Sequence, residues 1–216
     1  MDTTTRRGTT RGFSFIEILI AIAIIALLAG LLLPALARSK SKAIQTQCRS
    51  NMRQVGTGFR LWGDDNNDSY PMRVPMSKGG AEEAVLRGDV FRAFQCMSNE
   101  LSTPKILTCP ADQRPPAANF IDLQNINVSY FVGVDADEAN PRLFLTGDRN
   151  VTVNGTPAGS GLVSIKTPAT LGWTGQTHQG SGNVCLADGS VQMFTATTLQ
   201  NEFQNSRTNM QRLAFP

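Results

Sequence analysis

The sequence has little net charge and no overall excess of basic residues. Of its 216 residues, 20 are Lys or Arg and 17 are Asp or Glu, and the first twelve residues hold three arginines against one acid. The remainder is close to neutral. This argues against a nucleic-acid-binding protein, because such proteins need a concentrated positive surface.

Residues for metal or redox chemistry are also scarce. The four cysteines show no C-x-x-C spacing, which argues against a zinc site and against a dithiol redox motif. The sole histidine, His178, lies among Gly, Ser and Thr, where a structural hydrogen-bonding role is the more common one. A metal site formed by His178, Asp148 and Asp188 stays open but unsupported. We therefore expect no catalytic residue, no metal and no cofactor, and a protein that is not an enzyme.

What the sequence does have is one long apolar run. The 21 residues from Phe13 to Leu33 contain a single charge, Glu17, and about 20 apolar residues suffice to span a bilayer as a helix. A secretory signal peptide is the main rival, since Ala35-Leu36-Ala37 would fit its cleavage site. The run is longer than the roughly 7–15 apolar residues of such a peptide. We therefore favour a membrane anchor.

Glu17 is the unusual residue of this segment. A charged side chain at mid-bilayer costs roughly 2.5–3.5 kcal/mol on insertion scales, so it needs a partner. Alternatively, its side chain extends to the interface near Arg11. The sequence of residues 11–17, RGFSFIE, decides which alternative we favour.

These residues resemble the processing site of type IV pilins and type II secretion pseudopilins, in which a basic leader ends in Gly and Glu is the fifth mature residue. Pro34 would be the twenty-second, where many pilins have a helix-bending proline. The resemblance implies that prepilin peptidase cleaves after Gly12 and that the new amine of Phe13 is methylated. That ammonium would pair with Glu17 of a neighbouring subunit and set the stagger between subunits.

The periodicity predicts a long helix with two parts. A leader (1–12) precedes a transmembrane helix (13–36), and an amphipathic extension (37–63) follows, in which Pro34 bends the helix without ending it. One apolar stripe runs along the extension at helical spacing; its members are Ile44, Cys48, Met52, Val55, Phe59 and Trp62. Asp64–Ser69 reads as a loop that closes the helix.

The pattern of residues 64–216 predicts a small antiparallel sheet with long loops, since short apolar runs at 128–134 and 142–145 alternate with turn residues. Apolar spacing predicts one further helix over 82–99, although Gly88 interrupts it. The fold class is therefore α+β and pilin-like.

Residues 178–194 predict a β-hairpin with a two-residue Asp188-Gly189 turn. That turn would pair Leu186 with Val191 and Val184 with Met193. His178, nine residues and Asp188-Gly189 resemble the H-X9-DG element of a large prepilin-like family. Segments 107–110 (LTCP) and 145–148 (LTGD) resemble the middle of the same family.

Cysteine pairing cannot be chosen from sequence, since four cysteines allow three full pairings. A bridge between Cys96 and Cys109 would close a loop of about 14 residues and contribute at most ~3 kcal/mol. Cys48 lies on the apolar stripe and is expected in the core.

The resemblance implies a structural pilin or pseudopilin subunit of a type II secretion or type IV pilus-like filament. Its partners would be copies of itself, other pilin-like subunits, prepilin peptidase, the assembly machinery and the membrane, with no nucleic acid. It would cross the inner membrane once, with its N-terminus cytoplasmic and its C-terminal domain periplasmic or extracellular. The alternatives are a membrane-anchored extracytoplasmic module that binds glycan or metal, and a secreted enzyme released after Ala37.

Overall fold

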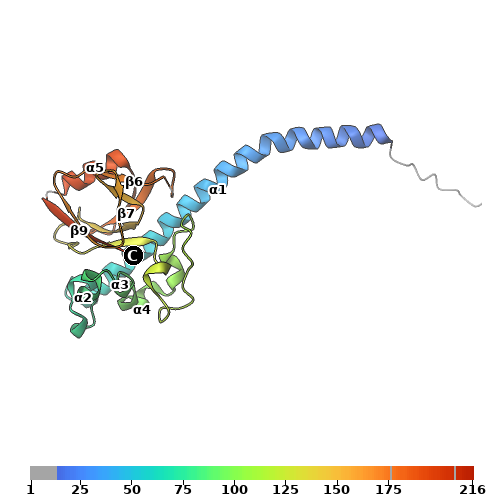
Figure 1. The fold of residues 1–216 in the computed structure, drawn as a ribbon. Helices are drawn as coiled ribbons and strands as arrows, with labels where there is room; N and C mark the ends of the chain where they lie inside the picture. The colour runs from blue at the N-terminus through green and yellow to red at the C-terminus, as the bar shows by residue number, and fades with distance from the viewer. Residues whose placement is uncertain (1–13, 176, 207) are drawn as a thin grey trace, which may run out of the picture. The chain divides into compact units, whose positions relative to one another are not determined.

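The structure is a computed structural model that describes residues 14–175, 177–206 and 208–216. A long N-terminal helix precedes antiparallel sheets, so the architecture is α+β and pilin-like, as predicted (Figure 1). The chain divides into two compact units, Met1–Ala43 and Ile44–Pro216.

Helix α1 (Phe15–Asp65) begins in the first unit and continues through Pro34. Its large apolar side chains from Phe15 to Leu36 are exposed, Phe15 to 81%. Among the residues that the structure describes, α1 is the one helix long and apolar enough to cross a membrane. An uninterrupted apolar surface of this length is stable in lipid rather than in water.

The part of α1 that lies in the second unit buries the predicted stripe. Cys48, Met52, Val55, Phe59 and Trp62 are all buried, and Ile44 packs against the same core. Their spacing places them on one face of the helix, which confirms the amphipathic pattern. The helix ends at Asp65 and a turn follows.

Six antiparallel strands form the main sheet in the order β5-β9-β1-β2-β7-β8. Their bounds are β1 (Tyr130–Gly133), β2 (Phe144–Asp148), β5 (Gly161–Lys166), β7 (Ser181–Leu186), β8 (Val191–Thr195) and β9 (Met210–Phe215). A smaller sheet has the order β4-β3-β6, formed by β3 (Val151–Val153), β4 (Thr156–Pro157) and β6 (Leu171–Trp173). The last strand of the chain, β9, therefore pairs on both sides, with β5 and β1.

The main sheet separates two apolar cores, because successive side chains of a strand point to opposite faces. In β1, Tyr130 and Val132 join the core that contains the α1 stripe, whereas Phe131 joins the second core. Helix α5 (Ala196–Asn205) contributes Leu199 and Phe203 to that second core.

Residues 82–99 form short helices, so the single predicted helix is wrong. The helices are α2 (Glu82–Leu86), α3 (Phe91–Cys96) and α4 (Ser98–Leu101). Gly88 has a φ of +99°, a left-handed conformation that ends the helical hydrogen-bond pattern after α2. Four 3-10 turns complete the region before the sheet: η1 (Pro71–Arg73), η2 (Met76–Lys78), η3 (Pro104–Leu107) and η4 (Asn125–Asn127).

The β7–β8 hairpin exists, but its predicted register is wrong by one residue. Cys185 pairs with Val191, and Val184 pairs with Gln192. The loop has three residues instead of two, because the Gly189 N–H donates to the Leu186 carbonyl and Gly189 has a φ of +83°. A turn followed by a left-handed glycine is the usual form of a three-residue hairpin loop.

Candidate functional site

Three distant segments meet in one buried cluster within the second unit. Cys109 follows η3, Asp148 ends β2, and His178 lies in the loop before β7; Cys48 joins them from α1. All four residues are buried. The cluster thus brings together the LTCP, LTGD and H-X9-DG segments, each of which the sequence had marked separately.

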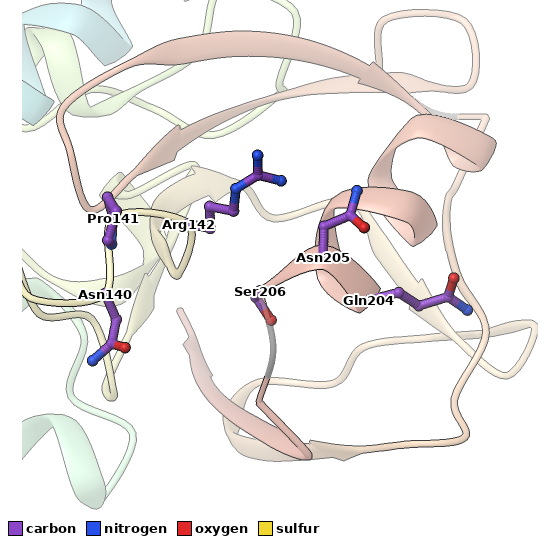
Figure 2. A pocket seen from close by; sticks show the side chains of 6 residues that line it. All are labelled: Asn140, Pro141, Arg142, Gln204, Asn205 and Ser206. Carbon is purple, nitrogen blue, oxygen red and sulfur yellow. The ribbon is translucent and has the colours of Figure 1, made fainter.

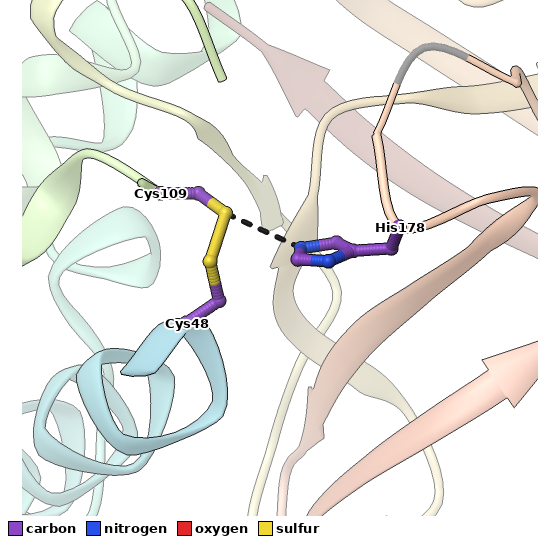
Figure 3. Close-up of side chains that lie close together, drawn as sticks. All are labelled: Cys48, Cys109 and His178. Atoms are coloured by element: carbon purple, nitrogen blue, oxygen red, sulfur yellow. Dashed lines mark hydrogen bonds between the residues drawn. A yellow bond between two sulfur atoms is a disulfide. The ribbon is translucent and has the colours of Figure 1, made fainter. Parts of the chain in front are cut away.

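Cys48 and Cys109 form a disulfide, with Cα atoms 5.2 Å apart (Figure 3). The Cys96–Cys109 bridge considered from the sequence is therefore wrong, and Cys48 is a disulfide partner as well as a core residue. The reason is geometric: the buried face of α1 places Cys48 beside Cys109, whereas Cys96 lies at the end of α3. Among the described residues, Cys96 and Cys185 remain thiols.

The His178 ring points at this disulfide, with Nε2 3.3 Å from Cys109 Sγ (Figure 3). The same nitrogen lies 3.5 Å from Asp148 Oδ2. His178 has a φ of +50°, which is uncommon for a residue with a side chain and costs of order 1–3 kcal/mol. Surrounding packing must hold His178 in this conformation.

Asp148 is a buried carboxylate with one satisfied oxygen. Its Oδ2 accepts hydrogen bonds from the Asn183 backbone N–H (2.7 Å) and from Asn183 Nδ2 (3.0 Å), while Oδ1 has no hydrogen-bond donor among the described residues. Burial raises the pKa of Asp148 above its usual range, although His178 and Asn183 act in the opposite direction.

A pocket of about 330 Å³ opens beside Cys109. Its lining includes Gln47, Asn51, Cys109, Asp112 and Arg114. Asp112 also accepts two hydrogen bonds from the Arg149 guanidinium, at 2.8 and 2.9 Å. This ion pair fixes one wall of the pocket next to the disulfide.

A pocket of about 620 Å³ lies elsewhere in the second unit (Figure 2). Six residues line it: Asn140, Pro141, Arg142, Gln204, Asn205 and Ser206. This lining is mostly amide and hydroxyl groups, with one guanidinium. It shares no residue with the buried cluster and does not bring together an acid and a base.

The remaining predicted site residues are dispersed. Gly12 and Phe13 lie outside the described residues. Glu17 is exposed in the first turn of α1 and accepts a hydrogen bond from the Ser14 N–H at 2.8 Å, which places its carboxylate at the beginning of the helix. Pro34 lies inside α1.

Asp188 and Gly189 occupy the β7–β8 loop, where Asp188 Oδ1 accepts the Ser190 N–H. The six residues of β7 separate this loop from His178, a rise of about 20 Å. Asp188 therefore lies too far from His178 to share a metal site with it. His178 and Asp148, the other two members of that set, are in contact. Asp188-Gly189 has a local role in closing the hairpin.

Comparison with known proteins identifies a motif at the N-terminal end of the chain only. Residues 7–33 match the model of the prokaryotic N-terminal methylation motif. The chain has a prepilin-type N-terminus. No curated protein and no solved structure matches the chain. The motif covers most of the apolar part of α1, including Glu17, but says nothing of the buried cluster.

Together, the motif and α1 show a membrane-anchored, single-pass protein that resembles the precursor of a type IV pilin. The motif implies processing by prepilin peptidase and assembly with pilin-like subunits. The buried cluster lies in the part of the chain for which the motif gives no role.

Proposed function

We propose that this protein is a structural pilin or pseudopilin subunit. It is cleaved after Gly12, methylated on Phe13 and assembled into a type II secretion or type IV pilus-like filament. The observation that carries this proposal is an unburied apolar helix that begins within the methylation motif and has one carboxylate, Glu17, in its first turn. A structural subunit of this kind is not an enzyme.

Glu17 is positioned to set the register between neighbouring subunits. Its carboxylate already accepts the Ser14 N–H at the start of α1, next to the amine that cleavage after Gly12 creates. In a bundle of apolar helices, pairing with a neighbour's Phe13 ammonium offsets the desolvation of both charges. A shifted register leaves both charges unpaired and is disfavoured by several kcal/mol.

The boundaries proposed for the mature protein follow the same logic. Residues 13–36 span the inner membrane with the N-terminus cytoplasmic, residues 37–63 extend the helix, and residues 64–216 form the outward-facing domain. The Cys48–Cys109 disulfide supports an extracytoplasmic place for that domain, since disulfides persist in oxidising compartments.

Glu17→Gln tests the proposal. Removing one partner of a buried ion pair costs roughly 3–5 kcal/mol, so the fraction of subunits in sheared, sedimented filaments should fall at least 100-fold. Membrane insertion should be unchanged or improved, because a charge has been removed from the span. Asp65→Asn is the matched control: it removes one exposed acid from the other end of α1 and should assemble normally.

Normal incorporation of the Glu17→Gln subunit into filaments would refute the register role. A wild-type protein that is found only in membranes, and never in filaments, would instead favour a membrane-anchored module that binds a ligand outside the cytoplasm.

A further inference from the structure

The buried cluster contains a set of metal-ligand atoms. The Sγ atoms of Cys48 and Cys109 and a ring nitrogen of His178 lie within 4.8 Å of one another, and all three residues are buried. Zn²⁺ in proteins prefers sulfur and imidazole nitrogen in a tetrahedral arrangement. The ligands come from separate segments, 61 residues apart for the two cysteines, so the short spacings of common zinc motifs are absent.

We propose that Cys48, Cys109 and His178 form a redox-gated zinc site. In the oxidised protein, the disulfide occupies both sulfurs and excludes the metal. A dithiol reductant transfers two electrons and two protons to the disulfide, so that two thiols form and the reductant becomes a disulfide. Zn²⁺ then binds both sulfurs as thiolates together with His178 Nε2, and two protons are released.

The distances agree with this geometry. With Zn–S of about 2.3 Å and Zn–N of about 2.0–2.1 Å, tetrahedral coordination separates sulfur from nitrogen by about 3.5 Å. Cys109 Sγ and His178 Nε2 are 3.3 Å apart. Two thiolates on one zinc ion are about 3.8 Å apart, a separation that opening of the disulfide permits.

Asp148 is suited to the fourth position. Its Oδ2 lies 3.5 Å from His178 Nε2, and its buried Oδ1 has no donor among the described residues. Asn183 orients the carboxylate with two hydrogen bonds, as the outer-sphere partners of metal ligands commonly do. A bound cation would offset the cost of burying this carboxylate.

The pocket lined by Cys109 gives a route of entry. It has a volume of about 330 Å³, and Asn51, Cys109 and Asp112 are among its lining residues. Both a small dithiol and hydrated Zn²⁺ fit this volume, since a water molecule occupies about 30 Å³ in the liquid.

The test uses the full-length protein in detergent. Samples oxidised, or reduced with a phosphine, receive one equivalent of Zn²⁺, and the bound metal is measured after gel filtration. We expect one zinc per reduced chain and at least tenfold less per oxidised chain. Cys96→Ser removes a thiol outside the cluster and should still bind one zinc. Asp148→Asn should weaken binding by about tenfold or more, because a neutral amide replaces a carboxylate ligand and even outer-sphere partners contribute this much.

Co²⁺ gives a readout that needs no variant. Reduced wild-type protein with Co²⁺ should show a thiolate-to-cobalt charge-transfer band together with the d–d bands of a tetrahedral site. A reduced wild-type protein that keeps its circular dichroism yet retains no zinc would overturn the proposal. A Co²⁺ spectrum without the thiolate band, or loss of zinc in Cys96→Ser, would also overturn it.

Discussion

The Cys48–Cys109 disulfide should contribute substantially to the stability of the second unit. It closes a loop between residues 61 positions apart. In the chain-entropy model, a loop of this length restricts the unfolded chain by about 4 kcal/mol at 25 °C. The Cys96–Cys109 bridge considered from the sequence would have closed a much shorter loop, of about 14 residues.

Replacing both cysteines with serine should therefore lower the melting temperature by roughly 8–16 °C, at about 2–4 °C per kcal/mol for a unit of this size. The assay is thermal unfolding of the full-length protein in detergent with a metal chelator, followed by the fluorescence of Trp62 and Trp173. Cys96→Ser is the control and should shift the melting temperature by little.

A thiol titration of the unfolded protein checks the pairing itself. The unreduced wild-type chain should show two reactive thiols, Cys96 and Cys185, and the reduced chain should show four. A count of four before reduction, or a double serine variant as stable as wild type, would refute the reasoning.

Two further perturbations test the sheet and the pocket wall. Gly133→Ala would place a methyl group against the Phe144 carbonyl oxygen of the neighbouring strand, so the urea midpoint should fall by the equivalent of roughly 1–3 kcal/mol; an unchanged midpoint would contradict the β1–β2 register. Burial raises the pKa of Asp112, but hydrogen bonds and charge from Arg149 outweigh it and hold that pKa below its usual value. Since the folded pKa is lowered, the stabilisation is present above the unfolded pKa of about 3.9 and is lost as pH falls through the folded pKa. Asp112→Asn should lower the free energy of unfolding by roughly 1.5–3 kcal/mol at pH 7, and the variant should lose less stability than wild type as the pH falls. Urea unfolding between pH 2 and 7 measures this; a variant whose stability falls with pH as steeply as that of wild type would contradict the prediction.

The sequence predicted the helix because its signals are local. The apolar run and the stripe from Ile44 to Trp62 repeat at the spacing of one helix, and the structure buries the stripe as expected. The hairpin was predicted from Asp188-Gly189 for the same reason. Its register was missed because Gly189 takes the third loop position, and both loop lengths fit the same residues.

The buried cluster could not be predicted in this way. Cys48, Cys109, Asp148 and His178 are brought together by sheet order and by the packing of α1, and neither follows from short-range periodicity. The resemblance of their segments to one family did mark Cys109, Asp148 and His178. It did not show that they meet, and the metal set considered from sequence included Asp188, which lies at the other end of β7.

Mass spectrometry of the mature N-terminus tests the central proposal most directly. The purified membrane protein should begin at Phe13 and carry one methyl group on its α-amine, since cleavage after Gly12 is what supplies Glu17 with its partner. A chain that begins at Arg38 would instead indicate a cleaved secretory signal. A chain that still begins at Met1 would contradict prepilin processing, and with it the proposed filament subunit.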